Sequence, residues 1–194
     1  MKKIFSLFLG LCSFATLAQN LPVSFKNGKT SVDVSIGGKP FTSYFFPGQD
    51  VLKKAVLFPL ISAHGTTITR GYPMAPRAGE RVDHPHHVGM WLNYEDVNGF
   101  DYWNNSNNIV SSLQNHKMGT IIHEKIISKK VENDKAVLNV SAKWVDNDGK
   151  GVEVLKENTT YVFSGTKDKF SFFCSSSPKY LVIPTTLFIN CGSL

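Results

Sequence analysis

Three histidines within four residues are the most chemically distinctive feature of this sequence, in the segment Asp83-His84-Pro85-His86-His87. Proline favours extended backbone for the residue before it, and on extended backbone His84 and His86 emerge on the same face. Their imidazoles can then converge on one ligand, either as acid–base groups or as metal ligands. His87 points to the opposite face unless the chain bends. The competing interpretation is a turn capped by Asp83, with the histidines buried as structural donors.

The histidines lie inside a segment of unusual composition, residues 70–103. It contains all three arginines of the chain and two of its three tryptophans. Rigid proline and glycine backbone combined with titratable and aromatic side chains is more typical of a binding site than of a simple connection. Aromatic faces beside amides and carboxylates suit sugar rings, although core packing explains some of these aromatics equally well. The residues expected to bind substrate are Arg70, Asp83, His87, Trp91, Asn98 and Trp103.

Glu157 is a further candidate for acid–base chemistry. Strand alternation puts its side chain on the same face as Leu155, Thr159 and Tyr161. Burial on an apolar face raises the pKa of a carboxyl group toward the range useful for proton transfer, and a neighbouring cation lowers it again. The alternative is a solvated groove, or a bulge that turns Glu157 outward. The predicted catalytic groups are His84, His86 and Glu157.

The sequence identifies no cofactor. A His-x-His pair suits zinc or copper, but the spacing fixes no third ligand, so a divalent metal at the histidines stays open. Asp96, Asn98 and Asp101 lack the spacing of an EF-hand loop, and a turn is the better interpretation. Cys174 and Cys191 could pair in an oxidising compartment, although two incidental thiols are the favoured interpretation.

Alternation of apolar and polar residues predicts the strands that position these groups. The expected strands are residues 31–36, 39–46, 55–61, 138–144 and 155–163. Gly37-Gly38 and residues 146–149 are turn signals between them, and Pro59 marks an edge or a bulge. At most one short helix is expected, at residues 108–114. The pattern predicts an all-β fold, an antiparallel β-sandwich.

The first eighteen residues resemble a signal peptide. Lys2 and Lys3 form a positive start, residues 4–17 are apolar but too short to span a bilayer, and Ala18 ends a small-residue cleavage pattern. The mature chain is therefore expected to begin near Gln19 and to be exported, either periplasmic or secreted. No membrane span is expected in the remainder.

The charge of the chain argues against a nucleic-acid partner. The net charge is +6, and removal of Lys2 and Lys3 leaves 19 basic and 15 acidic residues, a net charge of +4. The lysines are scattered and form no basic stripe of the kind that follows a phosphate backbone. The expected partner is a carbohydrate or another small molecule.

Several motifs together resemble the methane oxygenase PmoA-like family of exported bacterial proteins. They are Leu57-Phe58-Pro59-Leu60, Thr69-Arg70-Gly71-Tyr72-Pro73, Asp83-His84-Pro85-His86-His87, Gly89-Met90-Trp91, Asp96-Val97-Asn98-Gly99, Tyr102-Trp103 and Val154-Leu155-Lys156-Glu157. The resemblance implies a β-supersandwich like that of aldose epimerases and several polysaccharide enzymes, where histidines and a carboxylate perform acid–base chemistry at a sugar. Val88 stands where family members usually carry arginine.

The resemblance ends near Phe170 and covers about the first half of a typical family member. We therefore expect a signal peptide at residues 1–18, a sandwich domain at 19–170 that is incomplete at its C-terminal side, and an atypical tail at 171–194 produced by truncation or a frame shift. The expected function is that of an exported carbohydrate-directed protein, which binds sugar or performs acid–base sugar chemistry. The alternatives are a metal-dependent oxygenase, as the family name suggests, and a non-catalytic binding or structural module.

Overall fold

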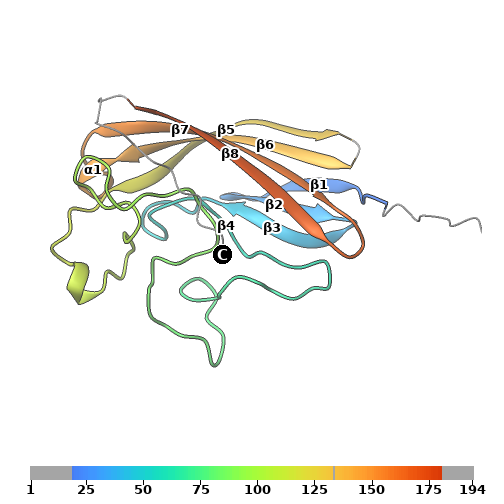
Figure 1. Ribbon diagram of the computed structural model, residues 1–194, viewed down its shortest axis with the longest axis horizontal. Coiled ribbons are helices and arrows are strands. Elements are labelled where there is room, and N and C mark those ends of the chain that lie inside the picture. Colours follow the sequence, from blue (N-terminus) through green and yellow to red (C-terminus); the bar gives the residue numbers. More distant parts are fainter. Residues whose placement is uncertain (1–18, 133, 181–194) are drawn as a thin grey trace, which may run out of the picture.

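The computed structural model describes residues 19–132 and 134–180. It consists almost entirely of two four-stranded antiparallel sheets. Figure 1 shows the two sheets stacked in layers, which confirms the predicted all-β sandwich. The expected signal peptide, Cys191 and the end of the expected tail lie outside the described residues.

The first sheet contains the predicted hairpin. Its strands, in spatial order, are β1 (Val23–Asn27), β2 (Ser31–Ile36), β3 (Lys39–Phe45) and β4 (Val56–Leu57). Gly37 and Gly38 connect β2 to β3 with φ angles of +58° and +76°. These left-handed values are what a two-residue hairpin turn requires, and glycine adopts them without a steric penalty.

The predicted strand at residues 55–61 is wrong in its extent, because the ladder with β3 includes only Val56 and Leu57; beyond it the N–H groups of Phe58 and Ile61 still donate to β3 carbonyls at 2.9 and 2.8 Å. Pro59 has no N–H to donate and cannot continue the ladder. Leu57 also exchanges two backbone hydrogen bonds with Met90, of 2.8 and 3.1 Å. These bonds attach the segment that carries the histidines to the edge of the first sheet.

The second sheet contains the longer strands. Its strands, in spatial order, are β5 (Thr120–Glu132), β6 (Lys135–Val145), β7 (Glu153–Gly165) and β8 (Phe170–Tyr180). The predicted turn between β6 and β7 is the single-turn α1 (Asp146–Gly149), in which Asn147 and Asp148 have left-handed φ angles of +48° and +55°. Strand β8 pairs with β7 from Gly165↔Phe170 to Leu155↔Tyr180. It therefore runs through the expected domain boundary at residue 170.

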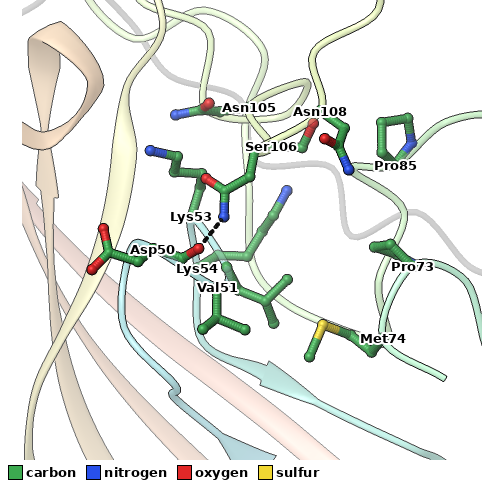
Figure 2. A pocket seen from close by; sticks show the side chains of 12 residues that line it. Asp50, Val51, Lys53, Lys54, Pro73, Met74, Pro85, Asn105, Ser106 and Asn108 are labelled. Carbon is green, nitrogen blue, oxygen red and sulfur yellow. Dashed lines mark hydrogen bonds between the residues drawn. The ribbon is translucent and has the colours of Figure 1, made fainter.

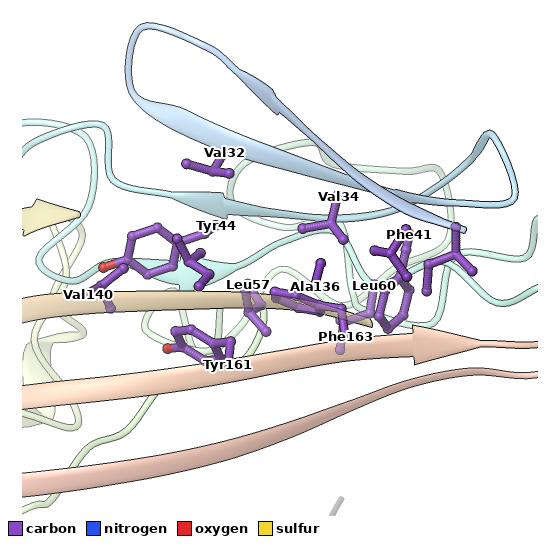
Figure 3. Close-up of a cluster of buried hydrophobic side chains, with 13 residues drawn as sticks. Val32, Val34, Phe41, Tyr44, Leu57, Leu60, Ala136, Val140, Tyr161 and Phe163 are labelled. Carbon is purple, nitrogen blue, oxygen red and sulfur yellow. The ribbon is translucent and has the colours of Figure 1, made fainter. Parts of the chain in front are cut away.

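A hydrophobic core fills the space between the sheets (Figure 3). Phe41 and Tyr44 of β3 meet Leu138 of β6 and Phe163 of β7, all of them at most 4 % exposed. The ring of Phe41 meets Phe163 edge-on at a centroid distance of 6.2 Å. Each such side chain contributes roughly 1.5–3 kcal/mol to stability through burial. The sandwich is therefore a stable scaffold for the segment that connects its two sheets.

That connection, residues 58–119, runs outside the two sheets from β4 to β5 (Figure 1). A single 3-10 turn, η1 (Ser111–Leu113), stands where one short helix was predicted. The pairing of Leu57 with Met90 attaches the connection to the first sheet, and the pairing of Asp101 with Met118 joins two parts of the connection to each other. No helix among the described residues is long and apolar enough to cross a membrane.

Candidate functional site

The three clustered histidines lie on a turn, which we call the histidine turn (residues 83–87). The N–H of His87 donates to the carbonyl of His84 at 3.0 Å, and His84 has a left-handed φ of +48°. The sequence predicted an extended backbone at His84. This prediction is wrong, because the backbone there is left-handed. The bend brings His87 to the same side as the other two, so three imidazoles meet where two were expected.

The imidazole rings of the histidine turn are in mutual contact range. His84 and His87 are stacked with centroids 5.0 Å apart and planes 18° apart. His86 lies edge-on to His87 at 4.3 Å and to His84 at 5.6 Å. Trp103 extends the cluster, with its ring centroid 5.6 Å from that of His87.

The histidines differ in burial and therefore in protonation. His86 is 3 % exposed, whereas His84 and His87 are exposed. Burial, together with the charges of His87 and Lys54, lowers the pKa of His86 to about 4. Burial together with the charges of His84 and Arg70 also lowers the pKa of His87. His86 is consequently a neutral imidazole at physiological pH, and the solvent-facing chemistry falls to His84 and His87.

Arg70 and Asp83 hold the histidine turn from the side. The Arg70 guanidinium donates to the Asp83 carboxylate at 3.2 Å and to the His84 carbonyl at 2.6 Å. Asp83 also contacts Arg81 and lies 3.0 Å from the Nδ1 of His84. Desolvation raises the pKa of Asp83, but the hydrogen bond from His84 and the two arginines outweigh it and leave that pKa below its usual value.

Lys54 supports the histidine turn through a hydrogen bond to its backbone, and the sequence analysis did not identify this residue. Its side chain is buried, at 3 % exposure, and its Nζ donates to the carbonyls of His86 at 3.2 Å and Trp103 at 3.3 Å. The same ammonium lies 4.4 Å from the centre of the Trp91 ring. Burial lowers the pKa of Lys54 to about 7, although the charge of Asp101 partly opposes it. Lysines beside strands are usually solvated, so no sequence pattern indicated this role.

Two tryptophans complete the cluster on the side away from Arg70. Trp91 is partly buried, and its ring centroid lies 5.8 Å from that of Trp103. Trp103 is 37 % exposed. The Nε1 of Trp91 is buried and has no hydrogen-bond partner within residues 19–132 and 134–180. The tryptophan pair thus forms an aromatic surface beside His87.

A cavity of about 380 Å³ adjoins the histidine turn (Figure 2). Pro85, the middle residue of the turn, and Lys54 both line it. The polar part of its lining comprises Asn105, Ser106, Asn107 and Asn108. Asn107 donates to the Asp50 carbonyl at 2.8 Å and so ties this part of the lining to the segment before Lys54. The volume is in the range of sites for small organic ligands.

Glu157 is not part of this cluster. It is 6 % exposed on β7 and accepts hydrogen bonds from the Trp144 indole at 2.9 Å and from the Thr159 hydroxyl. Burial raises the pKa of Glu157, and these two donors partly lower it again. The side chains that donate hydrogen bonds to Glu157 all belong to the second sheet. Strand alternation directs the Glu157 side chain into the space between the sheets. Glu157 is therefore a core carboxyl group, and the structure does not join it to His84 or His86.

Asn98 also lies apart from the histidine turn. Asn98 and Gly99 have φ angles of +55° and +79°, and Val97 and Phe100 exchange backbone hydrogen bonds of 3.0 and 3.1 Å across them. Asn98 is thus the exposed corner of a two-residue hairpin, which confirms the turn interpretation of this stretch. The predicted binding residues that the structure does gather are Arg70, Asp83, His87, Trp91 and Trp103.

The described residues contain no group of three or more His, Cys, Asp or Glu side chains that could hold a metal ion. His84 and His87 stack face to face in the histidine turn.

Residues 31–186 of the chain match a family model described as a family of unknown function, DUF6807. The chain belongs to this family. No curated protein and no solved structure matches it. The resemblance to the methane oxygenase PmoA-like family is therefore wrong: it rested on short motifs of a few residues each, whereas the DUF6807 match spans most of both sheets.

Proposed function

We propose that this DUF6807 protein binds carbohydrate at the histidine turn and the tryptophan pair, and that His84 and His87 exchange protons with the bound sugar. The observation that carries the proposal is the partly exposed indole of Trp103, 37 % accessible, beside the ring of His87. A pyranose ring can stack its C–H face on an indole while its hydroxyl groups reach polar neighbours. Two exposed imidazoles supply both hydrogen-bond donors and acceptors at that position.

The surroundings of the two histidines support acid–base chemistry. His84 and His87 are exposed, and the low pKa of His86 leaves a neutral ring behind them. Arg70 is paired with Asp83, so its guanidinium is engaged in an ion pair beside the two histidines.

The oxygenase alternative has lost its basis, since it came from the family resemblance that DUF6807 membership replaces. The non-catalytic alternative differs from the proposal only in turnover, so one experiment separates the two. Export is part of the same proposal. Mass spectrometry of the protein recovered from the periplasm or medium should find an N-terminus near Gln19, and an intact Met1 would contradict export.

The test is a panel of neutral and acidic glycans, screened for binding and then for turnover by polarimetry and reducing-end release. Wild-type protein should bind at least one neutral glycan, and Trp103→Ala and His87→Gln should each weaken that binding. Phe173→Ala is the matched control, because Phe173 is an aromatic side chain that is 64 % exposed on β8. Equal binding by all four proteins would refute the site. Binding without turnover would favour the non-catalytic module.

A further inference from the structure

A second group of titratable side chains lies on the other side of the hairpin that contains Asn98. There the surface is hollowed into a groove of about 600 Å³. The groove is lined by Tyr94, Glu95, Asp96, Gly99, Phe100, Asp101, His116 and Lys117. None of the roles described above uses His116, and no sequence motif singled it out.

Asp101 and His116 form a carboxylate–imidazole dyad at this groove. The Asp101 side chain is 6 % exposed, and one of its oxygens lies 3.2 Å from the Nδ1 of His116. Asn104 donates to the same carboxylate through its backbone N–H at 2.9 Å and its side-chain amide at 2.7 Å. The backbone fixes the pair as well, because Asp101 donates to the Lys117 carbonyl at 2.7 Å and accepts from Gly119 at 3.0 Å.

We propose that Asp101 and His116 form a second acid–base site, in which His116 removes a proton from a water molecule or hydroxyl group held in the groove. An ionised carboxylate can only accept hydrogen bonds, so it holds the proton of His116 on Nδ1. The Nε2 is then the basic nitrogen. The His116 side chain is 43 % exposed and lines the groove, so this nitrogen is within reach of a ligand. Asp101 is a positioning residue that stabilises the imidazolium formed on proton transfer.

The lining of the groove indicates the class of ligand. Glu95, Asp96 and Asp101 outnumber Lys117, so the field favours a neutral molecule over an anion. Tyr94 and Phe100 are half-buried and add aromatic surface. The groove therefore suits a neutral organic ligand with hydroxyl or ester oxygens. This inference is independent of carbohydrate binding at the histidine turn, because it uses different residues.

A neutral activated ester, p-nitrophenyl acetate, is a suitable probe of the dyad. In its hydrolysis the oxygen of water bonds to the acyl carbon and the bond from that carbon to p-nitrophenolate breaks. The proton of water passes to Nε2 of His116 and then to solvent. No oxidant, reductant or further reactant is needed.

The experiment compares hydrolysis of this ester at pH 8 by wild-type protein, His116→Gln and Asp101→Asn, with His64→Gln as the matched control. General acid–base catalysis contributes about 10²–10⁴-fold, so His116→Gln should lower the rate by about 100-fold or more. Asp101→Asn should lower it as well, and His64→Gln, at another exposed histidine, should leave it unchanged. Equal loss in the His64 and His116 variants would overturn the proposal, because it would mean that any surface imidazole suffices.

A spectroscopic measurement keeps the proposal testable if Asp101→Asn does not fold. Nitrogen-15 NMR of the histidine side chains should find that the neutral imidazole of His116 carries its proton on Nδ1. The His116 signal is assigned by its disappearance in His116→Gln. A neutral His116 protonated on Nε2 would overturn the proposal. The anionic ester 4-nitro-3-acetoxybenzoate should react more slowly than the neutral probe, and Glu95→Gln should reduce that difference.

Discussion

Acidification should destabilise this protein through His86. The pKa of His86 falls from its ordinary value of 6.5 to about 4 on folding, mainly because the ring is buried. The folded state therefore resists protonation more than the unfolded chain does. Since the folded pKa is the lower one, the stabilisation is complete above pH 6.5 and is lost as the pH falls toward 4.

The size of the effect follows from the same two values. At about 1.4 kcal/mol per pKa unit the full loss is about 3 kcal/mol, and about 2 kcal/mol of it has already occurred at pH 5. Solvent reaches the adjoining rings of His84 and His87 and screens the charge on His86. This screening reduces the loss of stability at pH 5 to between about 1 and 2 kcal/mol. That is a substantial part of a typical stability of about 5–15 kcal/mol.

Urea unfolding at pH 7.5, 6.0 and 5.0 measures this directly for wild-type protein and His86→Gln. The free energy of unfolding should fall more steeply with decreasing pH in the wild type, by about 1–2 kcal/mol at pH 5. His64→Gln, which removes an exposed histidine, should follow the wild type. Parallel curves for wild type and His86→Gln would refute the reasoning, because they would mean that His86 titrates alike in both states.

Three further substitutions test the core and the supports of the site. Glu157→Gln should melt higher than wild type at pH 8 and equally at pH 4, because burial raises the pKa of Glu157 and the stabilisation of its protonated form is lost as the pH rises; equal melting points at pH 8 would contradict this. Lys54→Met should speed amide exchange in the histidine turn by about tenfold, for loss of one hydrogen bond, whereas Lys53→Met should not. Gly89→Ala should cost about 2 kcal/mol or more by urea unfolding, since its Cβ would lie 2.3 Å from the Leu57 carbonyl, while Gly79→Ala, which has a similar φ but open space, should cost less.

The strands could be predicted because their signals are local. Val32, Val34 and Ile36 alternate with polar residues, which indicates a strand. The two glycines after them have positive φ angles, as a tight hairpin turn requires. The inward direction of Glu157 followed from the same alternation. Its separation from the histidines could not be predicted, because it depends on which strands face each other across the core.

The position of the histidine turn could be predicted from the sequence, but its backbone conformation could not. Pro85 suggested an extended chain, but His84 has a left-handed φ, and its carbonyl accepts a hydrogen bond from Arg70, fourteen positions earlier in the chain. Lys54 was missed because its burial requires the carbonyls of His86 and Trp103, both supplied by the distant connection. Such long-range contacts leave no pattern in a single sequence.

The most direct test of the central claim is an NMR titration of the labelled protein with the glycan that binds best in the panel. If the histidine turn and the tryptophan pair are the carbohydrate site, the side-chain signals of His84, His87 and Trp103 shift with a common saturation curve. The signals of His123, which is hydrogen-bonded to Tyr44, and of the exposed His64 stay unchanged. Shifts confined to other residues, or no saturable shift with any glycan of the panel, would contradict the account.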